Sequence, residues 1–338
     1  MSQEQSYQLV GANPSPYSRK LRAILRYRRL PHVWKVGTAD TLPELAQVRP
    51  KLVPLLRLPG EDQWRTDSTP LAHLLEQRHP GQRSIVPVDP GLAFICHLLE
   101  DFADEWVNKP MFHYRWHEDA TALWAANWIV RDTLPKAHGQ ALQQAAKFFH
   151  DRQRSRMAMV GCTPANAPVI EASYRRLLAL LESEVTAGRY LFGSRPSLAD
   201  FALYGQLAQL TIDPWPQRVC RELAPGVEAW AITLDDAAGI EGEWQPERAA
   251  ALREGLLEMV GAEYLPFLAA NARALAEGAG EVVVSVRGQE YRQAPVAYQG
   301  KCYAEIRRRW AGLSGEAQAS LRPLLESTAC LKWLVNTN

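Results

Sequence analysis

The sequence predicts an α/β domain at the N-terminus, an all-helical domain after it and an appended α+β segment that closes the chain. Short apolar stretches alternate with helical patterns up to residue 85, helical patterns recur between 98 and 207, and two strand-like stretches flank a glycine turn near the end. A chain of 338 residues is too long for one ordinary domain. We expect domains at 1–85 and 90–234, followed by an extension at 235–338.

Composition excludes several classes of partner. A net charge of +1 gives the protein no basic field to attract nucleic acid. No apolar run approaches the roughly 20 residues that span a bilayer, and the initial residues Met1, Ser2 and Gln3 do not begin a signal peptide. The hydrophobic fraction of 47% is ample for a packed core. We expect a cytoplasmic protein that binds neither nucleic acid nor membranes.

The cysteines and histidines indicate neither a disulfide framework nor a metal site. The cysteines are scattered, odd in number and never spaced as Cys-x-x-Cys. They are Cys96, Cys162, Cys220, Cys302 and Cys330. His113 and His117 lie four residues apart, but Glu118 would point away from their face of a helix. We expect no metal, and we expect most cysteines to be small buried apolar residues.

The first strand and the helix after it place a hydroxyl at a helix N-terminus. Residues 6–10 form a short, only partly alternating strand, and Gly11 ends it with a turn signal. Ser15 is the expected N-cap, and Pro16 suits the first helical position, where a missing N–H costs nothing. The predicted buried face of the helix is Tyr17, Leu21, Ile24 and Leu25. Ser15 therefore lies among unpaired backbone donors at the positive end of a helix dipole, where an anion is stabilised.

Five further elements complete the N-terminal domain. They are strands at 32–36, 49–58 and 63–66, a short helix at 43–46 and a helix capped by Asp67-Ser68-Thr69-Pro70. Proline cannot donate to a sheet ladder, so it belongs at the start or edge of a strand, and a cis bond is one tight way to place it there. The backbone of Val53, directly before Pro54, would then face outward.

These motifs resemble the thioredoxin-like N-terminal domain of the cytosolic glutathione S-transferase superfamily. Ser-Pro-Tyr-Ser at 15–18 stands where glutaredoxins have Cys-Pro-Tyr-Cys, and it resembles the Ser-Pro start of serine-type, bacterial-like transferases. Val53-Pro54 matches the family's Val-cis-Pro, whose valine backbone pairs with the cysteinyl part of glutathione. Asp67-Ser68 matches the acidic-Ser pair that holds the γ-glutamyl group. The chain carries these motifs in the family's order.

A fourth match lies in the second predicted domain. Residues 190–200 are similar to the helix-start box of the family's all-helical C-terminal domain. Ser197 and Asp200 have capping-box spacing, with Asp in place of the usual Glu. The helix that they begin carries Phe201, Leu203, Tyr204 and Leu207. The resemblance covers roughly the first two-thirds of the chain.

The resemblance implies glutathione as co-substrate and assigns its contacts. They are Ser15 at the thiol and Lys51, Val53, Pro54, Asp67 and Ser68 along the rest of the tripeptide. The family's Gly-Lys before Val-Pro is replaced by Lys51-Leu52, so either Lys51 or Arg49 is expected at the glycyl carboxylate. Tyr17 is a runner-up for the catalytic hydroxyl, although its place on the apolar helix face favours packing.

Simple magnitudes support an activating role for Ser15. A thiol of pKa about 8.5 is mostly protonated at neutral pH, and lowering that pKa by about 2 needs about 2.7 kcal/mol. A hydrogen bond to the charged sulfur supplies about 1.5–3 kcal/mol, and the helix N-terminus adds about 0.3–1 kcal/mol. Ser15 can thus act as a donor without losing its proton. Because Ser15 and Ser18 carry no sulfur, this motif cannot perform disulfide exchange.

An aromatic-rich stretch is the expected electrophile pocket. Residues 98–106 form a predicted helix with Phe102 and Trp106 four apart on one face. By analogy with the family, this region faces the glutathione sulfur. The expected pocket residues are Trp106, Phe112, Tyr114 and Trp116. An aromatic core between helices is the alternative for each of them.

The function that these patterns favour is a glutathione transferase whose Ser15-stabilised thiolate attacks a small hydrophobic electrophile. Glutathione-dependent ether cleavage, dehalogenation and isomerisation share this first step, and a non-catalytic binding or interaction protein of the same fold stays open. The family implies a homodimer. The extension contains a predicted helix at 264–276, a hairpin at 282–292 and helices at 302–313 and 315–325. Its role stays open between packing, a lid and a dimer contact.

Overall fold

The computed structural model describes residues 5–38, 41–81, 83–185 and 190–335. Residue contacts group the chain into two compact units. The first comprises 1–85, 114–154 and 200–242, and the second comprises 86–113, 155–199 and 243–338. Residues 1–3, on which the expectation about a signal peptide rests, lie outside the described part of the chain. The domain boundaries that the sequence suggests after 85 and 234 stay predictions.

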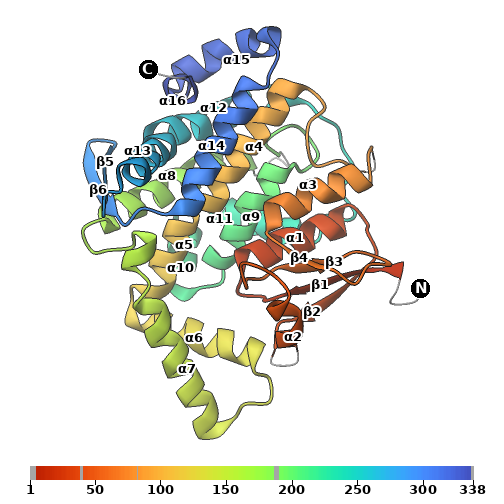
Figure 1. Ribbon diagram of the computed structural model, residues 1–338, viewed down its shortest axis with the longest axis vertical. Coiled ribbons are helices and arrows are strands. Elements are labelled where there is room, and N and C mark those ends of the chain that lie inside the picture. The colour runs from red at the N-terminus through yellow and green to blue at the C-terminus, as the bar shows by residue number, and fades with distance from the viewer. Residues whose placement is uncertain (1–4, 39–40, 82, 186–189, 336–338) are drawn as a thin grey trace. The chain divides into compact units, whose positions relative to one another are not determined.

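The first unit contains a four-stranded sheet in the order β2-β1-β3-β4 (Figure 1). Its strands are β1 (Tyr7–Gly11), β2 (His32–Val36), β3 (Leu55–Arg57) and β4 (Trp64–Thr66). β1 pairs parallel with β2 and antiparallel with β3, and β4 returns antiparallel beside β3. Leu9, at the centre of β1, stands opposite Trp34 on one side and Leu56 on the other. This is a thioredoxin-like sheet, and the predicted order of elements is confirmed.

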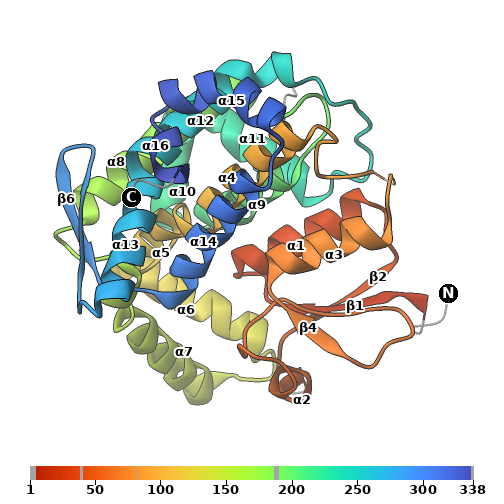
Figure 2. The ribbon, with the colours of Figure 1, turned by 45° about the horizontal axis from the view of Figure 1, so that its top comes forward.

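Two helices cover one face of this sheet and a short helix covers the other (Figure 2). They are α1 (Pro16–Tyr27) and α3 (Ser68–Arg78) on one face and α2 (Leu42–Ala46) on the other. On α1, Leu21, Ile24 and Leu25 are fully buried, as predicted. Tyr17 is only half-buried. Each of the three buried side chains contributes about 1.5–3 kcal/mol of hydrophobic stabilisation, so α1 is a firm support for the residue that caps it.

β3 is shorter than the predicted strand at 49–58. Pairing begins at Leu55, directly after Pro54, and ends at Arg57. Pro50 and Pro54 carry no N–H to donate to a ladder, which explains why the segment before Leu55 stays outside the sheet. The Arg49–Pro50 and Val53–Pro54 peptide bonds are both cis.

The rest of the first unit is helical. It contains α6 (Asp119–Thr133), α7 (Gly139–Arg154), α10 (Pro214–Leu223) and α11 (Pro225–Asp235). α6 packs against α7, and α10 packs against α11. The boundary between the two units falls within α5 (Asn108–Trp116) and within α9 (Leu198–Leu210). α9 begins directly after Ser197, where the sequence predicts the start of a helix.

The second unit consists of helices and one β-hairpin. Its elements are α4 (Pro90–Glu105), η3 (Ala158–Val160), α8 (Ala167–Val185), η4 (Pro246–Ala249), α12 (Ala250–Met259), the π-helical η5 (Val260–Tyr264), α13 (Leu265–Glu277), β5 (Val282–Val286), β6 (Gln289–Gln293), α14 (Ala297–Ala311), α15 (Gly315–Ser327) and α16 (Leu331–Leu334). β5 pairs antiparallel with β6, and Arg287 and Gly288 between them both have positive φ, as a type I′ turn requires. The predicted helices and hairpin of the extension are confirmed.

Most of the cysteines are buried, as the sequence predicts. Four of the five cysteines are buried, and Cys302 is half-buried. Burial raises the pKa of the Cys162 and Cys330 thiols to about 12, so both stay protonated at neutral pH. Within the described ranges, we find no helix with the length and apolar character needed to cross a membrane.

Gly261, in η5, is packed too closely to accept a side chain. A β-carbon there would lie 2.0 Å from the backbone carbonyl oxygen of Thr328. We expect Gly261→Ala to lower the free energy of unfolding by about 1–3 kcal/mol, because backbone must shift to relieve the overlap. Urea denaturation measures this loss. Gly300→Ala, on α14, is the matched control, since its β-carbon would overlap only the flexible tip of Leu275. Equal losses in the two variants would contradict the prediction.

Candidate functional site

Ser15 lies at the end of a tight turn between β1 and α1, which we call the serine loop (residues 12–15). It is the N-cap of α1, and its Oγ accepts a hydrogen bond from the Ser18 N–H at 3.3 Å. Its own N–H donates to the Ala12 carbonyl at 3.0 Å and closes the turn. Because capping uses an Oγ lone pair, the O–H proton stays available as a donor. The predicted N-cap is confirmed, and the half-buried hydroxyl lies at the positive end of the helix dipole.

Ser18, the second hydroxyl of the Ser-Pro-Tyr-Ser motif, has a different environment. Its side chain is fully buried, and its Oγ accepts from the Ala12 N–H at 3.2 Å. Gly11 leaves room for this packing, since a β-carbon there would lie 2.8 Å from the Ser18 β-carbon. Ser18 therefore stabilises the serine loop from within.

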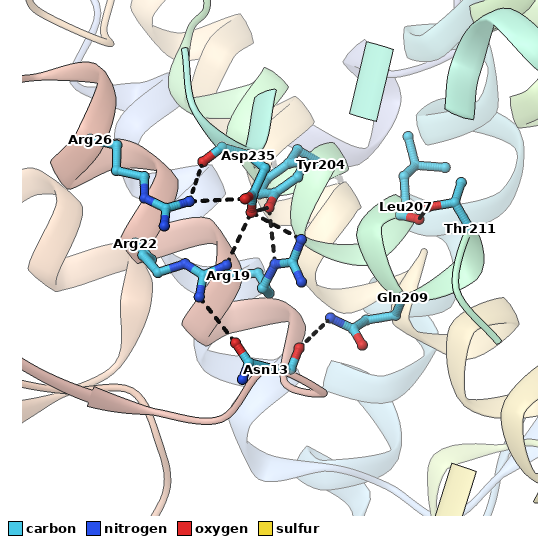
Figure 3. Close-up of polar contacts among 9 residues, drawn as sticks. All are labelled: Asn13, Arg19, Arg22, Arg26, Tyr204, Leu207, Gln209, Thr211 and Asp235. Atoms are coloured by element: carbon cyan, nitrogen blue, oxygen red, sulfur yellow. Dashed lines mark hydrogen bonds and ion pairs between the residues drawn. The ribbon is translucent and has the colours of Figure 1, made fainter. Parts of the chain in front are cut away.

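Asn13 connects the serine loop to three helices. Its N–H and its Nδ2 donate to the two carboxylate oxygens of Asp132, on α6, at 3.0 and 2.7 Å. Its Oδ1 accepts from the Arg22 guanidinium at 3.0 Å, and its carbonyl accepts from Gln209 Nε2 at 3.1 Å (Figure 3). A residue whose main chain and side chain are both bonded on opposite sides holds its turn in one conformation.

Arg115 holds the next carbonyl of the loop. Its Nη1 donates to the Pro14 carbonyl at 2.9 Å, its Nη2 to Gln209 Oε1 at 2.7 Å and its Nε to Asp213 Oδ2 at 2.6 Å. The side chains of Arg115 and Asp213 are 4% and 0% exposed. Burial raises the pKa of Asp213, and the neighbouring guanidinium opposes that rise. Two successive carbonyls of the serine loop, at Asn13 and Pro14, thus accept bonds from buried helical side chains.

A cluster of arginines on α1 surrounds Asp235, the last residue of α11. Arg19, Arg22 and Arg26 place guanidinium nitrogens 2.9, 3.1 and 2.9 Å from its carboxylate oxygens, and the Tyr204 hydroxyl donates to it (Figure 3). Burial acts to raise the pKa of Asp235, but the Tyr204 hydrogen bond and the guanidinium groups outweigh it and hold that pKa at about 2. Three cations share one carboxylate, so this part of α1 keeps an excess of positive charge.

The low pKa of Asp235 predicts an acid-labile contribution to stability. The pKa is about 2 in the folded state and about 3.9 in an unfolded chain, so the contribution is complete above pH about 4 and is lost as the pH falls toward 2. We expect it to be on the order of 1–2 kcal/mol, because the side chain is partly exposed to screening solvent. Urea unfolding at stepped pH should show this acid loss in the wild type and not in Asp235→Asn. Parallel pH profiles would contradict it.

The segment around Val53 lies directly before β3. Thr66 Oγ1 donates to the carbonyls of Leu52 at 2.8 Å and Pro54 at 3.1 Å and so skips Val53. Over the ranges that the structure describes, nothing hydrogen-bonds to the N–H or C=O of Val53. Lys51 is exposed. The outward-facing backbone that the sequence predicts at Val53 is consistent with this arrangement.

The start of α3 lies beside α1. Asp67 is the N-cap of α3, with φ of 80°, and its side chain accepts from the Thr69 N–H at 3.4 Å. Ser68 is buried. Lys20, a fully buried residue of α1, donates from Nζ to Thr69 Oγ1 at 3.4 Å. The helix that Ser15 caps and the helix that Asp67 caps are therefore joined through side chains.

The four aromatic residues expected in a pocket have mostly core positions. Trp106, in the second unit, is 1% exposed and donates from Nε1 to Ser173 Oγ at 3.0 Å and to Glu263 Oε2 at 3.2 Å. In the first unit, Tyr114 and Trp116 are each 1% exposed, with ring centroids 4.5 Å from Trp215 and 6.0 Å from Phe149 respectively. Phe112 is half-buried. Their assignment to a substrate pocket stays a prediction.

The two histidines that lie four residues apart have different environments. His113 is buried, with Nε2 3.0 Å from Glu171 Oε1, whereas His117 is exposed, with its ring 5.9 Å from Trp215. No group of three or more His, Cys, Asp or Glu side chains in the described part of the chain is placed to hold a metal ion.

Fold and serine loop together define a class: a thioredoxin-like domain with a serine at the mouth of α1 and a cis Val-Pro bond before β3. Residues 9–83 match the family described as "Glutathione S-transferase, N-terminal domain". Residues 141–231 match "Glutathione S-transferase, C-terminal domain". The chain therefore carries two stretches, in the family's order, that match the N-terminal and C-terminal domains of the glutathione S-transferase superfamily.

Solved structures with a similar chain fold include three bacterial proteins. A GST-like protein from Pseudomonas syringae is 17% identical, with a TM-score of 0.44 over 68% of this chain and 66% of that one. A glutathione S-transferase from Methylobacterium radiotolerans, in complex with glutathione sulfonate, is 21% identical, with a TM-score of 0.44 over 71% and 97% of the two chains. A β-etherase from Sphingobium is 17% identical, with a TM-score of 0.43 over 74% and 99%. A comparison with curated proteins gave no match.

Proposed function

We propose that the protein binds glutathione at the N-terminus of α1 and stabilises its thiolate with the Ser15 hydroxyl for attack on a small apolar electrophile. The observation that carries this proposal is the position of Ser15 as the N-cap of α1, with its O–H proton available. A thiolate sulfur in front of this cap would accept that proton in a charge-assisted hydrogen bond. It would also lie at the positive end of the helix dipole.

The rest of the tripeptide has matching partners. The N–H and C=O of Val53, which have no hydrogen-bond partner among the described residues, suit the cysteinyl main chain of an extended peptide, in the manner of an added β-strand. Pro54 holds that segment at the start of β3, and Asp67 and Ser68 at the start of α3 suit the γ-glutamyl group. The exposed ammonium of Lys51 suits the glycyl carboxylate.

The proposed chemistry needs one nucleophile and no disulfide exchange. The glutathione thiol releases its proton to solvent, the sulfur forms a bond to an electrophilic carbon of the co-substrate, and the leaving group departs with the electron pair of the broken bond. Ether cleavage and dehalogenation are both displacements of this kind, and they differ in the leaving group. The alternative of a binding protein without catalysis is an outcome of the test below.

Calorimetric titration with glutathione, followed by ultraviolet absorbance of the thiolate against pH, tests the proposal on the wild-type protein. We expect binding, with the pKa of the bound thiol about 2 below its free value. Binding with an unchanged thiol pKa would support a non-catalytic protein, and no binding at millimolar glutathione would refute the proposal. Light scattering tests the expected homodimer, which a mass of 37.9 kDa would contradict.

A further inference from the structure

We propose that Asp132 is a positioning residue for Ser15. Through its contact with Asn13, it keeps the Ser15 hydroxyl directed at the thiolate sulfur. The inference rests on the proposed function. Asp132 lies in α6, 119 positions from Asn13 in the sequence, and neither residue is among those that the family resemblance assigns to glutathione.

The contact between the two residues is bidentate. One carboxylate oxygen of Asp132 accepts from the Asn13 main-chain N–H at 3.0 Å, and the other accepts from Asn13 Nδ2 at 2.7 Å. The carboxylate therefore binds main chain and side chain together, which fixes both the path of the turn and the rotamer of Asn13. Asp132 is half-buried, so part of this contact is shielded from water.

The turn of the serine loop connects the contact at Asn13 to Ser15. Ser15 closes the serine loop by donating its N–H to Ala12, and Asn13 stands between these two residues. Arg22 and Gln209 hold Asn13 from other sides, at its Oδ1 and its carbonyl. Without Asp132, the N–H and the Nδ2 group of Asn13 both lose their acceptor, and only Arg22 and Gln209 still hold the turn that Ser15 closes.

Positioning and plain electrostatics predict opposite results. A carboxylate near a thiolate disfavours the charged sulfur, so removing the charge of Asp132 should lower the thiol pKa if charge alone matters. If Asp132 positions Ser15, removing its grip weakens the hydrogen bond from Ser15 to sulfur and raises the thiol pKa. The direction of the shift therefore separates the two roles.

The test uses Asp132→Asn in the full chain, with glutathione and a chlorodinitrobenzene as probes. The substituted side chain carries an NH2 group in place of one carboxylate oxygen, so one of the two bonds is lost. We expect the pKa of the thiol of bound glutathione to rise by about 1 and kcat/KM to fall about tenfold. The affinity for glutathione should change less than about threefold. Asp119→Asn is the matched control, because it removes the same charge from the same helix at a residue that pairs with Arg154.

A reversed pair tests the geometry. In Asn13→Asp combined with Asp132→Asn, the amide of residue 132 can donate to the new carboxylate while its oxygen accepts the main-chain N–H, and Arg22 keeps an acceptor. We expect this double variant to recover most of the kcat/KM that either single change loses. Asn13→Ala, which removes the side-chain grip, decides the matter if Asp132→Asn does not fold, and it too should raise the thiol pKa.

The outcomes separate this inference from the function on which it rests. A lowered wild-type thiol pKa that Asp132→Asn leaves unchanged, or lowers further, overturns the positioning role alone. A wild-type protein that binds glutathione without lowering its thiol pKa refutes the proposed function and the inference with it. An equal rise in Asp119→Asn would show that the effect does not depend on the contact with Asn13, and it would also overturn the role of Asp132.

Discussion

Replacing Ser15 by alanine should raise the pKa of the thiol of bound glutathione by about 1–2 and lower kcat/KM by about 10–100-fold. The hydrogen bond from Ser15 to the charged sulfur is worth about 1.5–3 kcal/mol, and each pKa unit corresponds to about 1.4 kcal/mol. Glutathione affinity should change little, because the proposed contacts at Val53, Asp67 and Ser68 stay intact. The measurements are thiolate absorbance against pH and steady-state kinetics with a chlorodinitrobenzene.

Ser15→Thr is the matched control for this experiment. Threonine keeps the hydroxyl and remains an acceptable N-cap, so the thiol pKa should stay close to the wild-type value. The stability of α1 needs a separate check, because alanine at an N-cap costs about 1 kcal/mol. If Ser15→Ala and wild type show the same thiol pKa, Ser15 has no activating role, whatever the stability of the variant.

Replacing Arg115 by methionine should lower the free energy of unfolding by about 3–5 kcal/mol. Asp213 is fully buried, and its second oxygen, Oδ1, has no hydrogen bond in the described structure. Arg115 is therefore the ion-pair partner on which this carboxylate depends, at 2.6 Å. Breaking a buried pair by removing one member leaves an uncompensated charge, and this is a large destabilisation. Urea denaturation measures it, and a loss below about 1 kcal/mol would show that the pair matters little.

The double variant Arg115→Met with Asp213→Leu separates the ion pair from the serine loop. Replacing both charges by apolar side chains should recover most of the lost stability, since the cost of burying the charges disappears together with their attraction. The Pro14 carbonyl still lacks its donor in this variant. We therefore expect a restored free energy of unfolding together with a raised thiol pKa.

The N-terminal half of the fold was predictable because its signals are local. Ser15 before Pro16 and Asp67 before Ser68 indicate helix starts within a few residues. The predicted strands at 6–10 and 32–36 are close to the observed ones. The third strand was predicted too long, because its length depends on which backbone groups can pair and not on apolar content. Two prolines decide that point.

The position of Ser15 at the N-cap of α1 was predictable from the sequence, but the residues that hold the serine loop were not. Asn13 has a turn signal, in the dipeptide Asn13-Pro14, that belongs to none of the matched motifs. Asp132, Arg115 and Gln209 lie in helices, where a polar residue that bonds a distant loop has the same local pattern as one that faces water. Likewise, aromatic composition does not separate a pocket from a core, and Trp106, Tyr114 and Trp116 proved to be almost completely buried.

The partners of the serine loop also bear on how far the N-terminal domain can be treated as an exchangeable module. Its carbonyls at Asn13 and Pro14 are bonded by Gln209 and Arg115, and its main-chain N–H at Asn13 by Asp132, all encoded outside residues 1–85. A chimera that joined this segment to the helical domain of another family member would inherit the serine and lose what orients it. A functional chimera would need these three distant side chains as well. The serine loop and its helical partners can therefore be exchanged only together.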